Sequence, residues 1–432
     1  MPATDRAQTT AVRHGTALAE NLPGIIERLA NMPPSVEAPY LTAYVDWRPM
    51  GDSPGRRAGM RVYIDAIEPF LAHHDAHTPS RESLEADIAR VTAYLENEAP
   101  DEAQGIMVVA CQANGTFEAV PLGLPVPTEL SHGPVPALRT LVRALNDAPS
   151  FAVVQLDQRE ANIFVVRQGR PAATLDIDST DSTREDRSTS GKETTIALRA
   201  EGQDAAFVRE VGDKLRIVLD RGNLDNYVVL GDEIVLPLME REFPKALLDK
   251  CIATANGDMR ETPEQAIERA LPIILAHERE REAAAVQQAR DLSKSGGPGV
   301  TGLDDTLTAL QSGQVETLVM TDDFNALGWA DYTLPVYGTG MPHSQHPAGG
   351  DPQNMTPVSM PDELVRLAVQ SSAAVETVRS AVPVTAAEED RIPDAHADGE
   401  MPRSDAARML DDLGGVAAIL RFALAEDQQT AN

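Results

Sequence analysis

The stretch GLDDTLTALQSGQVETLVM, residues 302–320, specifies its own local structure unusually fully. Asp304 is placed to cap a helix by accepting hydrogen bonds from the first free backbone N–H groups. The first three leucines recur at i, i+4 and i+7, which puts them on one helical face. Gly313 predicts a left-handed stop, and the apolar residues of 315–320 predict a buried strand. The stretch therefore predicts a short helix that leads into a strand.

The composition around this stretch predicts a multidomain protein without a membrane anchor. A chain of 432 residues suggests about three domains, and 42% hydrophobic residues are enough for ordinary packed cores. No apolar run is long enough to span a membrane, and the N-terminus has no apolar signal-peptide core. Cys111 and Cys251 lie far apart, so neither a Cys-rich zinc module nor a disulfide framework is expected. We expect a cytoplasmic monomer.

The charge of the chain is its most unusual property. There are 67 acidic and 37 basic residues, which gives a net charge of −30. Such a charge fits either a partner with a basic surface or adaptation to high internal salt, where counterions screen self-repulsion. The acids are spread along the chain, which favours adaptation to salt. A strongly acidic protein normally repels nucleic acid, but high salt screens that repulsion as well.

The first predicted domain, residues 1–149, alternates strands and helices. A short helix at 24–31 precedes an alternating strand, YLTAYVDW, at 40–47, and residues 59–98 are helix-like. Two more strands follow, and a proline-containing connector at 125–136 leads to another short helix. The two strands are GIMVVAC (105–111) and TFEAVPL (116–122).

The second predicted domain, residues 150–292, opens with a hairpin that turns around residues 158–160. A third strand, a helix with its apolar spacing near 207–218, and a fourth strand follow. Two helices then complete the domain, and Pro272 is a possible kink in the second. The strands are FAVVQLD, ANIFVVRQG, PAATLDI and NYVVLG, and the two final helices are 243–253 and 263–290.

The third predicted domain, residues 293–432, starts at the linker SKSGGPG and ends in DDLGGVAAILRF. Two polar stretches within it, 337–361 and 384–405, are rich in Pro, Gly or charged residues and predict mobile loops. Because strands alternate with helices in all three domains, the predicted fold class is α/β.

No motif in the sequence identifies a catalytic or metal site. His73, His74 and His77 lie close enough to offer two imidazoles to a metal, but no Glu stands nearby in a metalloprotease arrangement, and a solvated helix end is the favoured interpretation. The same holds for His343 and His346, which fall in the predicted mobile insertion. There is no phosphate-binding loop or nucleophile elbow, and both cysteines, one on a strand and one on an apolar helix, fit inert core thiols. We expect no catalytic residue, metal or cofactor.

The segment 178–195, DSTDSTREDRSTSGKETT, is the best candidate for a functional loop. It has no apolar residue, and a loop of this length is usually functional or disordered. It gathers Arg184, Arg187 and Lys192 next to Ser190–Gly191, and these cations can touch phosphates. A solubilising surface loop is the alternative.

The opening stretch resembles the start of the third domain of the eukaryotic and archaeal class-1 peptide release factors and their Pelota-type relatives. Both have a glycine, an apolar residue and an acidic pair, then a Thr–Leu–x–Ala–Leu helix, a glycine and a Val–Glu–x–Leu strand. The tail LGGVAAILRF (413–422) resembles the strand that closes that domain, and YLTAYVDW resembles the bacterial archaeo-eukaryotic release factor families. The residues that carry the third-domain resemblance are Gly302, Asp304, Asp305, Gly313, Gly414 and Gly415.

The resemblance implies a three-domain α/β architecture with mixed sheets flanked by helices. It implies a protein that enters the ribosomal A site, with the first domain toward the decoding centre and the third domain docked on a translational GTPase such as elongation factor Tu. In release factors the central loop carries Gly–Gly–Gln, whose glutamine helps water cleave peptidyl-tRNA. Segment 178–195 lacks that motif, and the first domain lacks the Asn–Ile–Lys–Ser codon signature.

These departures favour a ribosome-binding factor of hibernation (the Balon type) or rescue over a hydrolase. In this hypothesis Arg184, Arg187, Ser190, Gly191 and Lys192 contact ribosomal RNA. One alternative is a peptidyl-tRNA hydrolase with a noncanonical loop, in which Gln203 positions water. Another is a binding module outside translation, because a fold does not fix function.

Overall fold

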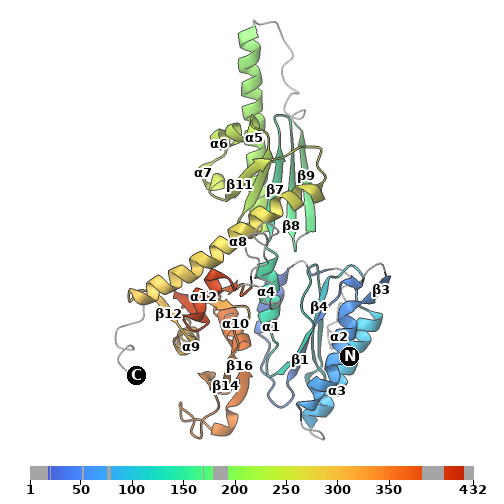
Figure 1. The fold of residues 1–432 in the computed structure, drawn as a ribbon, viewed down its shortest axis with the longest axis vertical. Helices are drawn as coiled ribbons and strands as arrows, with labels where there is room; N and C mark the ends of the chain where they lie inside the picture. The colour runs from blue at the N-terminus through green and yellow to red at the C-terminus, as the bar shows by residue number, and fades with distance from the viewer. Residues whose placement is uncertain are drawn as a thin grey trace, which may run out of the picture. The chain divides into compact units, whose positions relative to one another are not determined.

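The computed structural model describes residues 18–19, 21–50, 53–74, 79–168, 170–178, 193–381 and 403–422. Its contacts divide the chain into two compact units. Both contain sheets with packed helices, which confirms the α/β class (Figure 1). Within these ranges, no helix has the length and apolarity needed to cross a membrane. The units are Met1–Ala144 with Trp329–Pro335 and Pro342–Val358, and Leu145–Gly328 with Val336–Met341 and Ser359–Asn432.

The first unit contains an antiparallel sheet in the order β5-β4-β1-β6. Side chains of β1 and β4 that point to one face, such as Val45 and Val108, pack against Tyr63, Leu84 and Val91 of two helices. The predicted helix 59–98 is thus two helices, α2 and α3. The elements are α1 (Leu22–Ala30), β1 (Tyr40–Asp46), β2 (Pro49–Met50), β3 (Ser53–Arg57), α2 (Ala58–Ala72), α3 (Pro79–Asn97), β4 (Gly105–Cys111), η1 (Gln112–Asn114), β5 (Thr116–Leu122) and β6 (Glu129–Gly133).

The fourth strand of this sheet corrects the predicted connector at 125–136. β6 pairs antiparallel with β1, with Ala43 opposite Leu130. All five of its residues are only half-buried, because it lies at the edge of the sheet. Its sequence, ELSHG, lacks the apolar alternation that marks a strand with one buried face.

The second unit begins in helix α4 (Arg139–Asp147) and contains a mixed sheet in the order β11-β10-β7-β8-β9. β7, β10 and β11 are parallel, and β7, β8 and β9 form an antiparallel meander, as the hairpin prediction required. Helix α5 covers one face and the first half of α8 covers the other (Figure 1). The elements are β7 (Phe151–Leu156), β8 (Glu160–Arg167), β9 (Arg170–Asp178), α5 (Glu193–Gly222), β10 (Tyr227–Gly231), α6 (Val235–Glu242), α7 (Lys245–Leu248), β11 (Cys251–Asn256) and α8 (Pro263–Lys294).

The predicted helix 243–253 is wrong in its second half. Only Lys245–Leu248 is helical, and Cys251 begins strand β11, which pairs parallel with β10. Burial raises the pKa of the Cys251 thiol to about 11, so the thiol stays protonated at neutral pH. The prediction that Cys251 lies on a helix is therefore wrong, and its thiol is half-buried in a strand.

A second sheet of this unit, in the order β12-β18-β13-β17, contains the opening stretch. The second half of α8 and helix α12 cover one face, packing on Val319 and Ala417. Strand residues of the opposite parity, such as Leu318 and Met320, point to the other face, where α9 and α10 contact the sheet. The elements are β12 (Gly299–Thr301), α9 (Leu303–Gln311), β13 (Val315–Thr321), α10 (Met360–Gln370), β17 (Ala374–Val378), α12 (Asp405–Asp411) and β18 (Val416–Leu420).

The insertion 337–361, predicted as a mobile loop, is structured. It contributes to a small sheet in the order β15-β14-β16. His346, predicted to lie in a flexible loop, is buried with its Nε2 3.3 Å from the carboxylate of Asp331, and its Nδ1 accepts a hydrogen bond from the Ala348 N–H. Burial alone would raise the pKa of Asp331, but hydrogen bonds from Thr333 and Leu334 lower it overall. The elements are β14 (Leu327–Asp331), β15 (Val336–Thr339), η3 (Pro352–Asn354) and β16 (Thr356–Ser359).

Candidate functional site

The predicted RNA-binding residues, Arg184, Arg187, Ser190, Gly191 and Lys192, lie outside the described residues. The structure does describe what flanks them. Strand β9 ends at Asp178 and helix α5 begins at Glu193, so the end of the predicted loop 178–195 is helical. The segment 179–192 therefore joins the edge strand of the central sheet to the first turn of α5.

Helix α5 extends well beyond the sheet it covers (Figure 1). Among the side chains of α5 that the structure describes, from Gly202 onward, the buried ones include Ala205, Phe207, Val208 and Val211. The helical residues 193–204 before them add about 18 Å at the usual rise per residue. Residues 193–204 thus form a helical stem at the start of α5, and Gln203 is exposed on this stem.

Three motif glycines of the C-terminal sheet meet at one backbone crossing. Gly302, Gly414 and Gly415 all have positive φ, and a Cβ on Gly414 would lie 3.2 Å from the Gly302 Cα. The Gly302 N–H donates to the Val416 carbonyl over 2.9 Å, and the Gly415 carbonyl accepts from Thr321. These glycines therefore hold α9, β13 and β18 together, and their conformational freedom explains their position in the motif.

The predicted cap of α9 is wrong, and the rest of the motif is as predicted. Gly302 is the N-cap and makes no side-chain cap bond. Asp304 instead accepts a hydrogen bond from the Thr339 Oγ1 over 2.5 Å. Leu307 and Leu310 are buried, and Gly313 has φ of +67° directly after the helix.

The motif leaves a surface of mixed character around the start of α9. Asp304 and Asp305 are exposed. Thr339, bonded to Asp304, is followed by Gly340, whose N–H donates to the Leu327 carbonyl. Leu327 and Met341 beside this bond are 65% and 68% exposed. We call Asp304, Asp305, Leu327 and Met341 the α9 face. Sequence reasoning missed its two apolar residues, because an isolated Leu or Met carries no sign of exposure.

The histidines do not assemble a metal site in the part of the chain that the structure describes, where no group of three or more His, Cys, Asp and Glu side chains could hold a metal. His77 lies outside the described residues. His74 Nε2 lies 3.0 Å from His132 Nδ1, and His74 Nδ1 lies 3.1 Å from the Phe70 carbonyl. The pair thus ties the end of α2 to β6.

The His74–His132 pair predicts acid sensitivity of the first unit. Burial lowers the pKa of His132 to about 4, and His74 adds to the effect. A folded-state pKa below the unfolded value near 6.5 means that the folded state binds fewer protons, so this stability is complete above about pH 6.5 and is lost as the pH falls toward 4. We expect His132→Gln to reduce the acid-induced loss of unfolding free energy by about 2 kcal/mol.

Urea denaturation across that pH range measures this effect. His73→Gln is the matched control, because His73 is exposed and its ring contacts a carbonyl of its own helix. An unchanged pH slope in the His132 variant would show that another group causes the acid loss.

Residues 136–274 match the model for bacterial archaeo-eukaryotic release factor family 10, and this range contains the whole central sheet. No curated protein matches the sequence. Similar solved structures include an archaeal translation termination factor, aRF1, at 15% identity, covering 94% of this chain and 99% of that chain with a TM-score of 0.23.

Two other similar structures are Pelota-type proteins. Archaeoglobus fulgidus Pelota is 16% identical and covers 73% of this chain and 79% of its own, with a TM-score of 0.29. S. cerevisiae Dom34, a translation termination-like factor that interacts with Hbs1, is 13% identical and covers 74% and 82%, with a TM-score of 0.36. Over residues 136–274, which include the β7–β11 sheet, the chain is similar to the bacterial archaeo-eukaryotic release factors.

Proposed function

We propose that this protein is a translation factor that binds the ribosomal A site in hibernation or rescue and does not itself hydrolyse peptidyl-tRNA. One observation carries the proposal: the central sheet matches a release-factor family, yet Gly–Gly–Gln is absent from the sequence. Each of its three Gly–Gly pairs, at 296, 349 and 414, is followed by a residue other than glutamine.

The central part of the chain supplies the proposed contact with ribosomal RNA. The fourteen residues 179–192, directly before the helical stem of α5, contain three cations, Arg184, Arg187 and Lys192. Arginine and lysine bind phosphate through charge-assisted hydrogen bonds, and such contacts weaken as salt rises. Three acidic residues, Asp181, Glu185 and Asp186, share these fourteen positions, so the segment is neutral overall while the chain as a whole has a net charge of −30. Its lower negative charge makes it better suited to RNA than the acidic remainder of the chain.

The α9 face supplies the proposed contact with a translational GTPase such as elongation factor Tu. Exposed apolar side chains with a charged rim are typical of protein interfaces. Leu327 and Met341 offer the apolar contacts, and Asp304 and Asp305 suit a basic rim on the partner. In this proposal the chain comprises three functional domains, residues 1–149, 150–292 and 293–432.

Cosedimentation with ribosomes tests the proposal. Charge reversal of all three cations (Arg184→Glu, Arg187→Glu, Lys192→Glu) should lower ribosome affinity at least tenfold, because it replaces three phosphate contacts with repulsion. The matched control reverses three exposed cations elsewhere, Arg61, Lys245 and Arg408, so both variants have the same net charge. Equal binding by both variants, or no binding by the unaltered protein during growth and starvation, would refute the proposed function.

The same preparations separate a binding factor from a hydrolase. Gln203 is exposed on the stem of α5, which keeps it available as a noncanonical water-positioning residue. We expect no peptidyl-tRNA cleavage by the unaltered protein. Cleavage that Gln203→Ala abolishes would establish the enzymatic function instead.

A further inference from the structure

Helix α8 changes character in its middle. Its buried positions at a spacing of four begin with Ala266, Ala270 and Ile274, which pack on the central sheet. Val286 and Ala289 continue them on the C-terminal sheet. Between these apolar ends the same helical face carries two glutamates, Glu278 and Glu282, whose side chains are 7% and 12% exposed. Buried carboxylates at core positions need specific partners.

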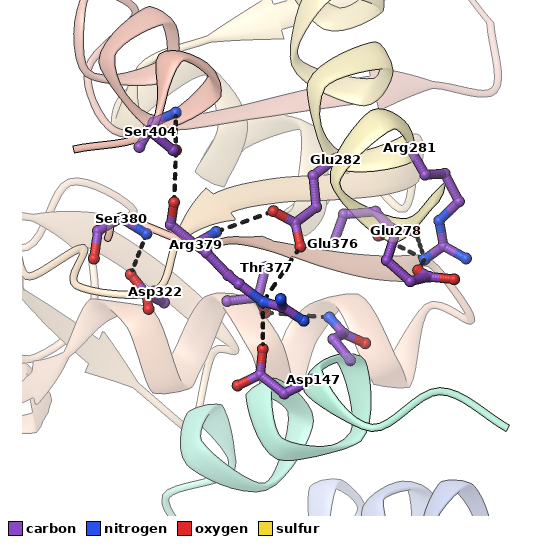
Figure 2. Close-up of polar contacts among 12 residues, drawn as sticks. Asp147, Glu278, Arg281, Glu282, Asp322, Glu376, Thr377, Arg379, Ser380 and Ser404 are labelled. Atoms are coloured by element: carbon purple, nitrogen blue, oxygen red, sulfur yellow. Dashed lines mark hydrogen bonds and ion pairs between the residues drawn. The ribbon is translucent and has the colours of Figure 1, made fainter. Parts of the chain in front are cut away.

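Arg379, directly after strand β17, is the partner of Glu282 (Figure 2). Its backbone N–H donates to Glu282 Oε2 over 3.2 Å, and its Nε lies 3.7 Å from Glu282 Oε1. The same Nε donates to Asp147 Oδ1, at the end of α4, over 2.8 Å. One guanidinium therefore links three elements that are far apart in sequence.

Two neighbouring sets of contacts also connect these elements, and we call the whole group of contacts between α8, β17 and α4 the joint (Figure 2). Arg281 donates to both carboxylate oxygens of Glu376 at 2.9 Å and lies 3.4 Å from Glu278. The Asn146 side chain donates to the Val375 carbonyl over 2.9 Å. Strand β17 is thus held to α8 by two arginines and to α4 by Asn146 and Asp147.

The end of α4 depends on these polar contacts. From Leu145 to Ser150, the connection into β7, no residue is fully buried, and the side chain of Asp147 is 39% exposed. The apolar core therefore does not fully enclose any residue of this segment. Exposed and half-exposed ion pairs contribute little net stability, so contacts of this kind can open while the rest of the fold stays intact.

The joint also carries more negative than positive charge. Burial raises the pKa of Glu278 and Glu282, and neighbouring carboxylates add to the rise. Because the closed joint holds protons more tightly than a solvated one, protonation favours the closed state. The charged and titratable groups that face these glutamates are Asp147 from α4, His277 and Arg281 from α8, and Glu376 and Arg379 from β17 and the residue after it.

We propose that Arg379 is a latch that fastens the end of helix α4 to the C-terminal sheet. Its ion pair with Asp147 opens locally while the protein stays folded, and weak acid favours the closed pair. Asp147 and Glu282 compete for one guanidinium. When Glu282 takes up a proton, its repulsion of Asp147 ends, and Arg379 pairs with Asp147 alone. The latch would thereby control how firmly the connection from α4 to β7 is held.

Hydrogen exchange by mass spectrometry of the full-length protein tests the latch, with rates corrected for the intrinsic effect of pH. Arg379→Ala should make exchange in residues 139–150 several-fold faster and leave α3 unchanged. Arg290→Ala is the matched control, since its guanidinium pairs with Asp291 of the same helix. Glu282→Gln should slow exchange of the α4 end at about pH 8 and remove most of its change toward pH 5.

The latch is refuted if exchange at the α4 end is the same in the unaltered protein and in the Arg379 and Glu282 variants at both pH values. Faster exchange throughout the second unit of Arg379→Ala would mean global destabilisation. In that case the Glu282→Gln variant alone tests the latch, because glutamine preserves the shape of the side chain and removes its charge. If Glu282 only packed, this variant would show the same pH dependence of exchange as the unaltered protein.

Discussion

Replacing Arg366 with alanine should destabilise the C-terminal sheet by about 3–5 kcal/mol, the cost of breaking a buried ion pair by removing one of its members. Arg366 and Glu363 lie one turn apart on α10, with side chains 4% and 1% exposed. The guanidinium donates to Glu363 over 2.8 Å and to the Tyr337 hydroxyl over 2.7 Å. Alanine removes both bonds while the Glu363 carboxylate stays buried. Urea denaturation measures the loss of unfolding free energy, and hydrogen exchange in α10 and β13 shows where the structure is weakened.

A double variant separates the charge effect from the lost volume. Arg366→Met with Glu363→Leu removes both charges and keeps apolar bulk, so it should recover most of the stability that Arg366→Ala loses. Arg366→Lys keeps the charge without the planar fork and should be intermediate. A double variant as unstable as Arg366→Ala would show that the polar contacts themselves, rather than the charge of Glu363 after Arg366 is lost, determine the stability of α10.

The parts of the fold that the sequence predicts well are those with local signals. The α9–β13 unit follows from leucine spacing and one glycine, and the hairpin of β7 and β8 follows from two apolar runs around a polar turn. Strand β11 was missed because its identity depends on pairing with β10, about twenty residues earlier. Read locally, KALLDKCIA has the spacing of a helix.

Long-range contacts explain the other differences. The insertion 337–361 has the composition of a loop, yet His346 is buried with its Nε2 3.3 Å from the Asp331 carboxylate, and Gln311 of α9 accepts a hydrogen bond from the Tyr337 N–H. The latch joins Asp147, Glu282 and Arg379, which are each separated by more than ninety positions. Neither arrangement leaves a periodicity or a motif in the sequence. The apolar half of the α9 face was missed for the same reason.

Substitutions at the motif glycines test whether these residues are needed for the packing of the C-terminal sheet. Gly415→Ala should destabilise the C-terminal sheet by roughly 2–4 kcal/mol, combining left-handed strain with overpacking. Gly415 has φ of +78°, and a Cβ there would lie 2.8 Å from the Phe324 ring. Gly313→Ala is the matched control, since Gly313 has φ of +67° with nothing within 4 Å of an added Cβ. It should cost roughly 1 kcal/mol, from backbone strain alone.

A double-mutant cycle then isolates the close approach. Phe324→Ala should lower the cost of Gly415→Ala to nearly that of Gly313→Ala, because the ring is the obstacle. Equal costs for the two glycine variants would contradict the crowded crossing. The distinction matters for function, because Gly415 is buried at the crossing, while Asp304 and Asp305 are exposed. Gly415→Ala should therefore impair partner binding only as far as it unfolds the sheet, and the α9 face should account for any specific contact.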